Sequence, residues 1–183
     1  MSGGSGALSV TGAGSSLAVR GQDAVIWVGN GSTQAGDGGV GTLIVNDSVL
    51  AAPLIEIGAR GYVGGNGTLV GQVVNRGVFS PGNSPGTPLI DGGFLHAEGG
   101  RLVLEIEADG QGGFRTDRLV FGDTSLVDLG SLAISFRFLG RTVPLAFQAQ
   151  GGFDIDSFFA LQSGAPLDHA KFAAVGYSAS AAA

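Results

Sequence analysis

Short apolar segments alternate with tight turns between Gly65 and Asp91, and this pattern constrains the fold more than any other feature of the chain. The segments 67–74 and 77–79 are rich in β-branched and large apolar residues, which favour extended strands. The segments 75–77 and 80–86 (NRG and SPGNSPG) favour turns, because Gly, Asn and Pro supply the backbone angles that turns need. Two Ser-Pro-Gly units in close succession exclude a helix. The pattern predicts short strands joined by sharp corners.

A repeated apolar pair in the first 60 residues supports the same prediction. Three copies are spaced nine residues apart and two more follow: Leu8-Ser-Val10, Leu17-Ala-Val19, Ile26-Trp-Val28, Leu43-Ile-Val45 and Ile55-Glu-Ile57. Residues two positions apart in a strand face the same side, so each pair is expected to place two side chains inward. The residues between them, Ser9, Ala18, Trp27, Ile44 and Glu56, are expected to face outward.

The segment from Gly65 resembles a motif of secreted bacterial β-helix proteins. The matching residues are Gly65-Asn66-Gly67-Thr68-Leu69, Asn75, Gly77 and the segment SPGNSPGT (80–87). The families are autotransporter passenger regions, filamentous-haemagglutinin-like adhesins and PEP-CTERM-sorted surface proteins. The resemblance implies a fold and an extracellular location, and it carries no catalytic residues, since these families share none.

The predicted fold is all-β, a right-handed parallel β-helix (β-solenoid) with a C-terminal antiparallel or capping β layer. The alternative is a β-sandwich or an up-and-down barrel, which also uses short strands and Gly-rich turns. Parallel stacking fits better because the early turns are irregular in length and contain no clean Asn-Gly hairpin between matched strands. A repeat of nine residues is one strand and one turn, so a full coil would need two or three repeats.

Longer alternating strands are predicted after residue 99, at 101–107, 117–121 and 131–138. In the first of them, Leu102, Leu104 and Ile106 are expected on one face, opposite Arg101, Glu105 and Glu107. The chain is therefore divided into a linker-like start (1–6), solenoid rungs (7–98), longer amphipathic strands that continue the solenoid (99–150), and a cap with an Ala/Ser-rich tail (151–183).

Composition excludes several classes of function. The chain has 35 Gly among 183 residues, yet 44% of its residues are hydrophobic, which argues against Gly-rich disorder. Its net charge of −6 argues against nucleic acid and anionic membrane surfaces as partners. Cysteine is absent, which excludes disulfides and thiolate metal sites. No apolar run approaches the ~18 residues of a membrane span. We expect the chain to be a piece of a longer secreted protein.

Catalytic and metal-binding patterns are weak. The histidines, His96 and His169, lie in no ligand spacing and are expected to be solvated or locally hydrogen-bonded. The Gly-x-Ser-x-Gly spacing occurs once, at 82–86, inside the turn segment SPGNSPG and without the strand-turn-helix context of a nucleophile elbow, so no catalytic serine is expected. The loop 34–41 differs in order from calcium-binding nonapeptides and occurs once, so it is interpreted as a Gly-rich loop. We therefore expect no catalytic, cofactor or metal site.

Two acidic pairs could line a cleft suited to glycoside hydrolysis: Asp154 with Asp156, and Glu105 with Glu107. A solvated strand face is the favoured interpretation of both. Asp117 with Arg115 and Arg118 forms a thin lyase-like cluster, interpreted as paired surface charge. Trp27 and Tyr62 could stack on sugars, although packing between strands is the alternative for Trp27.

These observations predict a secreted or cell-surface structural or adhesive segment without catalysis. The alternative is a carbohydrate-binding or polysaccharide-cleaving module on the same scaffold. Self-association, or end-to-end stacking through unpaired strand edges, is a predicted partner interaction, and a surface glycan or host surface is another. The expected location is extracellular or at the bacterial cell surface.

Overall fold

The computed structural model describes residues 4–29, 38–82, 85–129, 133–139, 155–167 and 176–179. In these ranges the protein is all-β apart from the 3-10 helix η1 (Ile155–Ser157). The strands form two sheets of eight strands each, and nearly all neighbouring strands are parallel. No helix in the described ranges is long and apolar enough to cross a membrane.

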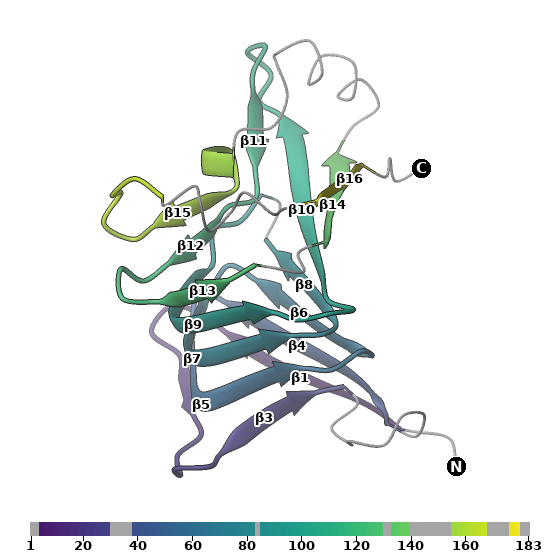
Figure 1. The fold of residues 1–183 in the computed structure, drawn as a ribbon, viewed down its shortest axis with the longest axis vertical. Coiled ribbons are helices and arrows are strands. Elements are labelled where there is room, and N and C mark those ends of the chain that lie inside the picture. Colours follow the sequence, from purple (N-terminus) through teal and green to yellow (C-terminus); the bar gives the residue numbers. More distant parts are fainter. Residues whose placement is uncertain are drawn as a thin grey trace.

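Sheet A and sheet B both run along the length of the molecule, with the core between them (Figure 1). Sheet A contains, in spatial order, β1 (Ser5–Thr11), β4 (Val40–Asn46), β6 (Gly61–Gly65), β8 (Val78–Pro81), β10 (Arg101–Ala108), β14 (Ala133–Leu139) and β16 (Gly176–Ala179), with β11 (Phe114–Thr116) paired to β10. Sheet B contains β15 (Phe159–Leu161), β12 (Leu119–Phe121), β9 (Leu89–His96), β7 (Thr68–Asn75), β5 (Val49–Ile57) and β2 (Ser16–Ala18), with β13 (Leu126–Asp128) paired to β9 and β3 (Val25–Val28) paired to β5.

The chain alternates between the two sheets from β4 to β9, so successive layers each contain one strand of sheet A and one of sheet B. Neighbouring strands of one sheet are separated by similar lengths of chain: Val49 pairs with Thr68, and Thr68 pairs with Leu89. The layers are stacked from the N-terminal end of the molecule, near β1 and β3, towards β15 and β16 (Figure 1). The core lies between the two sheets.

The prediction of a right-handed parallel β-helix with a capping layer is wrong. The described residues form two mostly parallel sheets, each with open edges, and no closed solenoid. The strand β11 departs from parallel stacking, because it pairs antiparallel with β10 through a hairpin. Carboxylate Asp109 sets this turn by accepting hydrogen bonds from the N–H groups of Gln111 (2.7 Å) and Gly113 (2.9 Å). The prediction of all-β structure with parallel pairing is confirmed.

The nine-residue repeat does not mark equivalent strands. The first copy lies in β1 of sheet A, whereas the second and third belong to β2 and β3, which pair with the two halves of β5 in sheet B. Sequence spacing could not show this, because the separation of the two halves depends on a bend within β5.

Sheet B bends where Pro53 interrupts β5. Its register with β7 shifts between Ala51 and Leu54, since proline lacks the N–H that a ladder needs. The neighbouring Gly71 and Gly92 have positive φ (119° and 144°), and a Cβ on Gly71 would overlap the Ala52 carbonyl oxygen. This bend explains why the edge strands of sheet B are short and occur in pairs.

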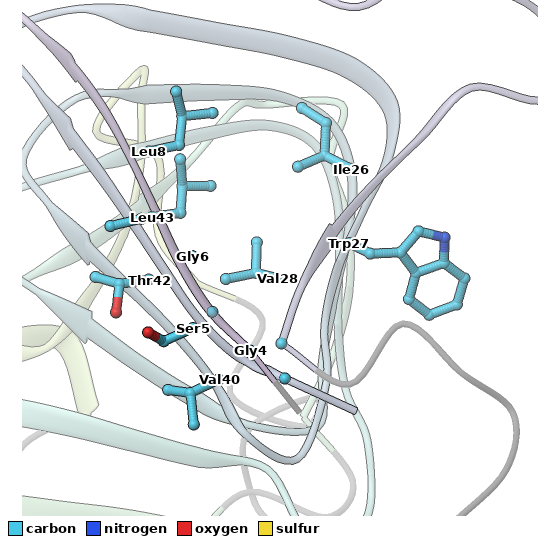
Figure 2. A pocket seen from close by; sticks show the side chains of 14 residues that line it. Gly4, Ser5, Gly6, Leu8, Ile26, Trp27, Val28, Val40, Thr42 and Leu43 are labelled. Atoms are coloured by element: carbon cyan, nitrogen blue, oxygen red, sulfur yellow. The ribbon is translucent and has the colours of Figure 1, made fainter. Parts of the chain in front are cut away.

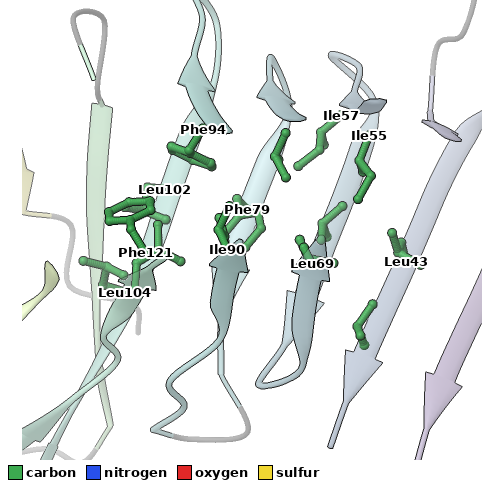
Figure 3. Packing of buried hydrophobic residues seen from close by; sticks show 14 of the residues in the cluster. Leu43, Ile55, Ile57, Leu69, Phe79, Ile90, Phe94, Leu102, Leu104 and Phe121 are labelled. Atoms are coloured by element: carbon green, nitrogen blue, oxygen red, sulfur yellow. The ribbon is translucent and has the colours of Figure 1, made fainter. Parts of the chain in front are cut away.

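The core consists of columns of inward-facing side chains, and each layer contributes one residue to a column. In sheet B, one column runs through Leu50, Leu69 and Ile90, and a second through Ile55, Val73 and Phe94. Aliphatic residues fill the layers near β4 and β5, and phenylalanine rings fill the later layers (Figure 3). The ring of Phe94 lies 5.9 Å from those of both Phe79 and Phe121, measured between centroids. The inward face of β10 is as predicted, with Leu102, Leu104 and Ile106 fully buried. The outward residue Glu105 is buried as well, so the interpretation of this face as solvated is wrong for it.

The C-terminal strands continue the sheets and do not form a separate layer over them. The strand β15 pairs parallel with β12, and β16 pairs parallel with β14. About half of the predicted cap (151–183) lies outside the described residues. The division of the chain into four segments stays a prediction.

The segment SPGNSPG lies where the chain passes from β8 in sheet A to β9 in sheet B, which agrees with the predicted corner. The Gly82 N–H donates to the Gly65 carbonyl oxygen at 3.0 Å, and the Gly86 N–H donates to the carboxylate of Asp117 at 2.7 Å. Residues 83–84 lie outside the described residues. The corner is therefore fixed partly by an aspartate that lies far away in the sequence.

Ser48 joins the first two layers, and replacing it by alanine is expected to lower the free energy of unfolding by about 1 kcal/mol. Its buried hydroxyl donates to the Val10 carbonyl oxygen at 2.7 Å, and alanine would leave this oxygen without that donor. Urea denaturation followed by circular dichroism measures the change. Ser16→Ala, at an exposed position of β2, serves as the control. An equal effect of both substitutions would contradict the role of the Ser48 hydroxyl.

Candidate functional site

The predicted carboxylate pair on β10 does not line a cleft. Glu105 is buried, and its Oε1 lies 2.6 Å from Arg137 Nη1. Glu107 is partly exposed, and its Oε2 lies 2.8 Å from Arg115 Nη2. Each carboxylate is neutralised by its own arginine, so the two do not share a proton as a hydrolytic acid and base would.

The second predicted carboxylate pair, Asp154 with Asp156, does not lie on a strand in the described part of the chain. Asp156 lies in η1, and Asp154 lies outside the described residues, as does His169. The backbone carbonyl of Asp156 accepts a hydrogen bond from Arg118 Nη2 at 2.9 Å. Arg118 is thus used to hold η1 near β12. In the part of the chain that the structure describes, no three His, Asp or Glu residues form a group that could hold a metal ion.

Asp117 is fully buried, and its interpretation as paired surface charge is wrong. Its Oδ1 accepts the Gly86 N–H (2.7 Å) and its Oδ2 accepts the Glu105 N–H (2.8 Å). The carboxylate therefore fills the position beside β10 between the end of β8 and the end of β11. The sequence signal that could have found it is the row of glycines in SPGNSPG, because a loop with free N–H groups favours an anionic partner.

Burial raises the pKa of Asp117 to about 7. The hydrogen bonds from Gly86 and Glu105 lower the pKa, the nearby Glu105 carboxylate raises it, and Arg137 lowers it. A carboxyl group with a pKa near neutrality is suited to proton transfer, but a substrate must reach it. Because Asp117 is 0% exposed, we assign it a structural role.

His96 is also buried, at the end of β9. Its Nδ1 lies 3.2 Å from Nδ2 of Asn75, which is its register partner on β7. Of the two environments expected for His96, solvent or a local hydrogen bond, the structure shows the hydrogen bond. Its Nε2 has no hydrogen-bond partner in the described part of the chain. Burial lowers the pKa of His96, and the Gly100 backbone raises it by less. The imidazole is enclosed in protein, which is the arrangement of a packing residue.

Trp27 and Tyr62 do not form one sugar-stacking platform. Trp27 lies on β3 of sheet B and Tyr62 lies on β6 of sheet A, each exposed on the outer face of its own sheet. The Tyr62 ring covers Gly64 on the same strand, since a Cβ there would lie 2.9 Å from the ring. The first half of the Gly-rich loop 34–41 lies outside the described residues.

An apolar area covers the outer face of sheet B between β3 and β13, and we name it the outer patch. It consists of Val25, Trp27, Leu54, Val74, Leu95 and Leu126. These residues alternate along their strands with buried ones such as Ile55 and Phe94, so they face away from the core. Trp27 is 46% exposed and Leu126 is 80% exposed, at opposite edges of the patch. The alternation of residues in the sequence predicts that Trp27 faces outward, but the patch depends on the strand register, which the sequence alone does not show.

The charges within the outer patch are few. Glu56 lies beside Trp27 in the register, and its Oε1 is 3.4 Å from Arg76 Nε. Asp128 lies at the far edge, in register with Leu95. Between the two edges the register also places Gln72 beside Leu54, so polar and apolar residues are mixed at the centre of this face. The exposed Trp and Leu side chains at its edges still suit contact with another surface more than isolation in water.

A second apolar surface lies at the N-terminal end of the stacked layers, between β1 and β3. It is a groove of about 440 Å³ lined by uncharged residues, including Leu8, Ile26, Val28 and Leu43. These four side chains point towards one another, whereas the Trp27 ring points away from them (Figure 2). We name this surface the end groove. It is the core space between the two sheets at the point where the layers end.

Comparison of the chain with protein-family models, curated proteins and solved structures finds no match. The resemblance to secreted bacterial surface proteins therefore stays a prediction. Function has to be argued from the two apolar surfaces.

Proposed function

We propose that this protein is a structural or adhesive segment of a secreted or cell-surface protein and that it acts by contact, without catalysis. The observation that carries the proposal is the outer patch, where Trp27 and Leu126 are exposed on a sheet face with little charge. Such an area loses contact with water when it meets another surface, and each Å² of apolar area removed contributes roughly 25 cal/mol.

The two sheets suit this task because they hold the patch rigid. Every layer from β5 to β9 is joined to the next by a parallel ladder, with up to eight register pairs between β7 and β9. A rigid surface loses little conformational entropy when it binds, so more of the contact energy contributes to affinity. The Glu56–Arg76 ion pair lies within the patch and adds polar contacts for a partner.

The cell-surface location rests on the resemblance of the segment 65–87 to secreted bacterial proteins. The β-helix that the resemblance implied is not found, so the location is supported by the motif and by the composition alone. A polysaccharide or a host cell surface is the partner we propose for the patch. Aromatic side chains such as Trp27 stack on sugar rings.

We expect the double substitution Trp27→Ser with Leu126→Ser to weaken adhesion by about tenfold or more, because exposed aromatic anchors contribute most of the energy of a contact. Retention of the purified protein on immobilised bacterial polysaccharides and on host-cell monolayers measures adhesion. Tyr62→Ser is the matched control, since Tyr62 is similarly exposed but belongs to sheet A.

The outcomes separate the proposal from its alternative. Saturable binding that the double substitution weakens and the control does not would support adhesion through the outer patch. Release of oligosaccharides from the polysaccharide would overturn the non-catalytic proposal in favour of a cleaving module. Absence of binding to all of the surfaces would contradict an adhesive role.

A further inference from the structure

A third surface lies at the corner where the chain passes from sheet A to sheet B, and it is polar. The connections between the two sheets differ in length at this corner. Residues 12–15 join β1 to β2, whereas only residues 47–48 join β4 to β5 and only residues 66–67 join β6 to β7. These three neighbouring connections and the residues that follow them line a recess of about 270 Å³, which we name the corner pocket.

The first residues of sheet B form an outward-facing wall of the corner pocket. Ser16, Val49 and Thr68 are register partners on β2, β5 and β7. The residues that follow Val49 and Thr68, which are Leu50 and Leu69, are buried, so the side chains of the wall face away from the core. Val49 is 37% exposed and lies between the two hydroxyl residues. The wall therefore has an apolar centre with a hydroxyl group on each side, on strands about 9.5 Å apart.

Asp47 places a carboxylate in the corner pocket, and Asn66 from the next layer holds it there. The φ of Asp47 is 50°, in the left-handed region that Asp tolerates better than most residues. Its N–H donates to Asn66 Oδ1 at 3.1 Å, and Asn66 Nδ2 donates to Asp47 Oδ1 at 3.2 Å. Among the described residues, Asp47 Oδ2 and the hydroxyls of Ser15, Ser16 and Thr68 have no hydrogen-bond partner. These four groups are available to a ligand in fixed positions.

The chemistry of the corner pocket favours an uncharged sugar. The only charge among its lining residues is the Asp47 carboxylate, which accepts strong hydrogen bonds from hydroxyl groups and repels an anionic ligand. Serine and threonine hydroxyls both donate and accept, so they match sugar hydroxyls in either orientation. The Val49 side chain is placed to pack against the C–H groups of a sugar ring while the surrounding polar groups fix the orientation of the ring.

We infer that the corner pocket binds one uncharged sugar unit, with Asp47 Oδ2 accepting hydrogen bonds from its hydroxyls and Val49 packing against its ring. Asn66 acts as a positioning residue, since it holds the backbone and the carboxylate of Asp47. The corner pocket shares no residue with the outer patch, so the inference goes beyond the contact proposed there. A recess for a single sugar would add selectivity that an open sheet face lacks.

Titration of isotope-labelled protein with soluble sugars, followed through its amide chemical shifts, tests the site. The probes are glucose, galactose, mannose and maltose, with glucuronic acid as the anionic counterpart and calcium chloride as a cation. We expect saturable shifts with a neutral sugar at the amides of residues 14–16, 47–49 and 66–68. Glucuronic acid is expected to bind at least about tenfold more weakly than glucose, because its carboxylate would meet that of Asp47.

Substitutions assign the binding to named groups. Asp47→Gly removes the carboxylate and retains the backbone conformation, because glycine adopts positive φ freely, and we expect it to weaken sugar binding about tenfold or more. Thr68→Val removes one hydroxyl without a protein partner and is expected to weaken binding about threefold or more with little effect on stability. Asp23→Gly is the matched control, since it removes the same charge from an exposed turn outside the pocket and is expected to leave binding unchanged.

The other outcomes overturn the inference. Absence of saturable shifts with every sugar, shifts confined to other amides, or equal binding of glucose and glucuronic acid would show that the pocket is not a site for neutral sugars. Shifts with calcium chloride alone would identify a cation site instead. Equal affinities of wild type, Asp47→Gly and Thr68→Val would contradict the assigned contacts, and Thr68→Val keeps this test if Asp47→Gly fails to fold.

The two proposals fail independently. The double substitution Trp27→Ser with Leu126→Ser is expected to weaken adhesion to surfaces and to leave the shifts with soluble sugars unchanged. Loss of the soluble-sugar shifts in this variant would show that the sugar lies on the outer patch and would overturn binding at the corner pocket.

Discussion

Replacing Phe94 by alanine is expected to lower the free energy of unfolding by about 3 to 5 kcal/mol, which would be among the largest effects of any single substitution in this chain. Its ring is fully buried and lies 5.9 Å from the rings of Phe79 in sheet A and Phe121 in sheet B, between centroids. Alanine would leave a cavity at the place where the two sheets meet. Urea unfolding monitored by far-ultraviolet circular dichroism measures the loss.

Leu95→Ala is the matched control, because Leu95 is the next residue on the same strand and faces outward. We expect this substitution to cost about 1 kcal/mol or less, as is usual for partly exposed positions. Similar losses for the two variants would mean that β9 does not present Phe94 to the core. The comparison therefore tests the register of β9 as well as the packing of one ring.

The faces of the strands could be predicted from the sequence, but the sheets could not. On β10, Leu102 and Leu104 alternate with Arg101 and Val103, and this period of two settles which side is buried. Which strand pairs with β10 is not a local property. Its partners β8 and β14 lie on both sides of it in the sequence, and the β10–β11 hairpin depends on the Asp109 turn.

The bend in sheet B shows the same limit in the prediction of the fold. Pro53 is visible in the sequence, and a proline predicts an interrupted strand. The consequence, that β2 and β3 pair with different halves of one strand, needs Gly71 beside Pro53 in the next layer. The nine-residue spacing of the three apolar pairs therefore does not reveal that their strands lie in two sheets.

The candidate surfaces were predictable only in part. Trp27 faces outward as its place between Ile26 and Val28 predicts, because alternation is local. The outer patch also needs Leu126, which reaches the same face through the pairing of β13 with β9. For the burial of Asp117 the sequence holds only the indirect signal of the glycines in SPGNSPG, because its partner Gly86 is 31 positions away and a charged residue in a polar segment is usually exposed.

The stability of the protein is expected to fall as the pH rises from about 4 to about 7, through the ionisation of Asp117. Its pKa is raised from 3.8 to about 7 in the folded protein, so the native state holds a proton in this range that the unfolded chain has released. The contribution is fully present below pH 3.8 and is lost as the pH passes the folded value. A shift of this size corresponds to about 4 kcal/mol at most, at 1.36 kcal/mol for each pH unit.

Asp117→Asn isolates this contribution, because an amide does not ionise. We expect the free energy of unfolding of the wild type, relative to this variant, to decrease by up to about 4 kcal/mol between pH 4 and pH 8. Chemical unfolding at a series of pH values gives the difference. The contribution of His96 is the same in both proteins and cancels in this difference. The lowered pKa of His96 acts in the opposite direction to that of Asp117, because it removes stability as the pH falls below 6.5.

Asp109→Asn is the control for the substitution itself. Hydrogen bonds from Gln111 and Gly113 lower the pKa of Asp109 below 3.8, so its contribution is constant from pH 4 to pH 8. A constant difference between wild type and Asp117→Asn over this range would contradict the prediction. It would mean that the N–H groups of Gly86 and Glu105 outweigh burial and keep the Asp117 carboxylate ionised, with a charge enclosed between β8 and β11 at every pH measured.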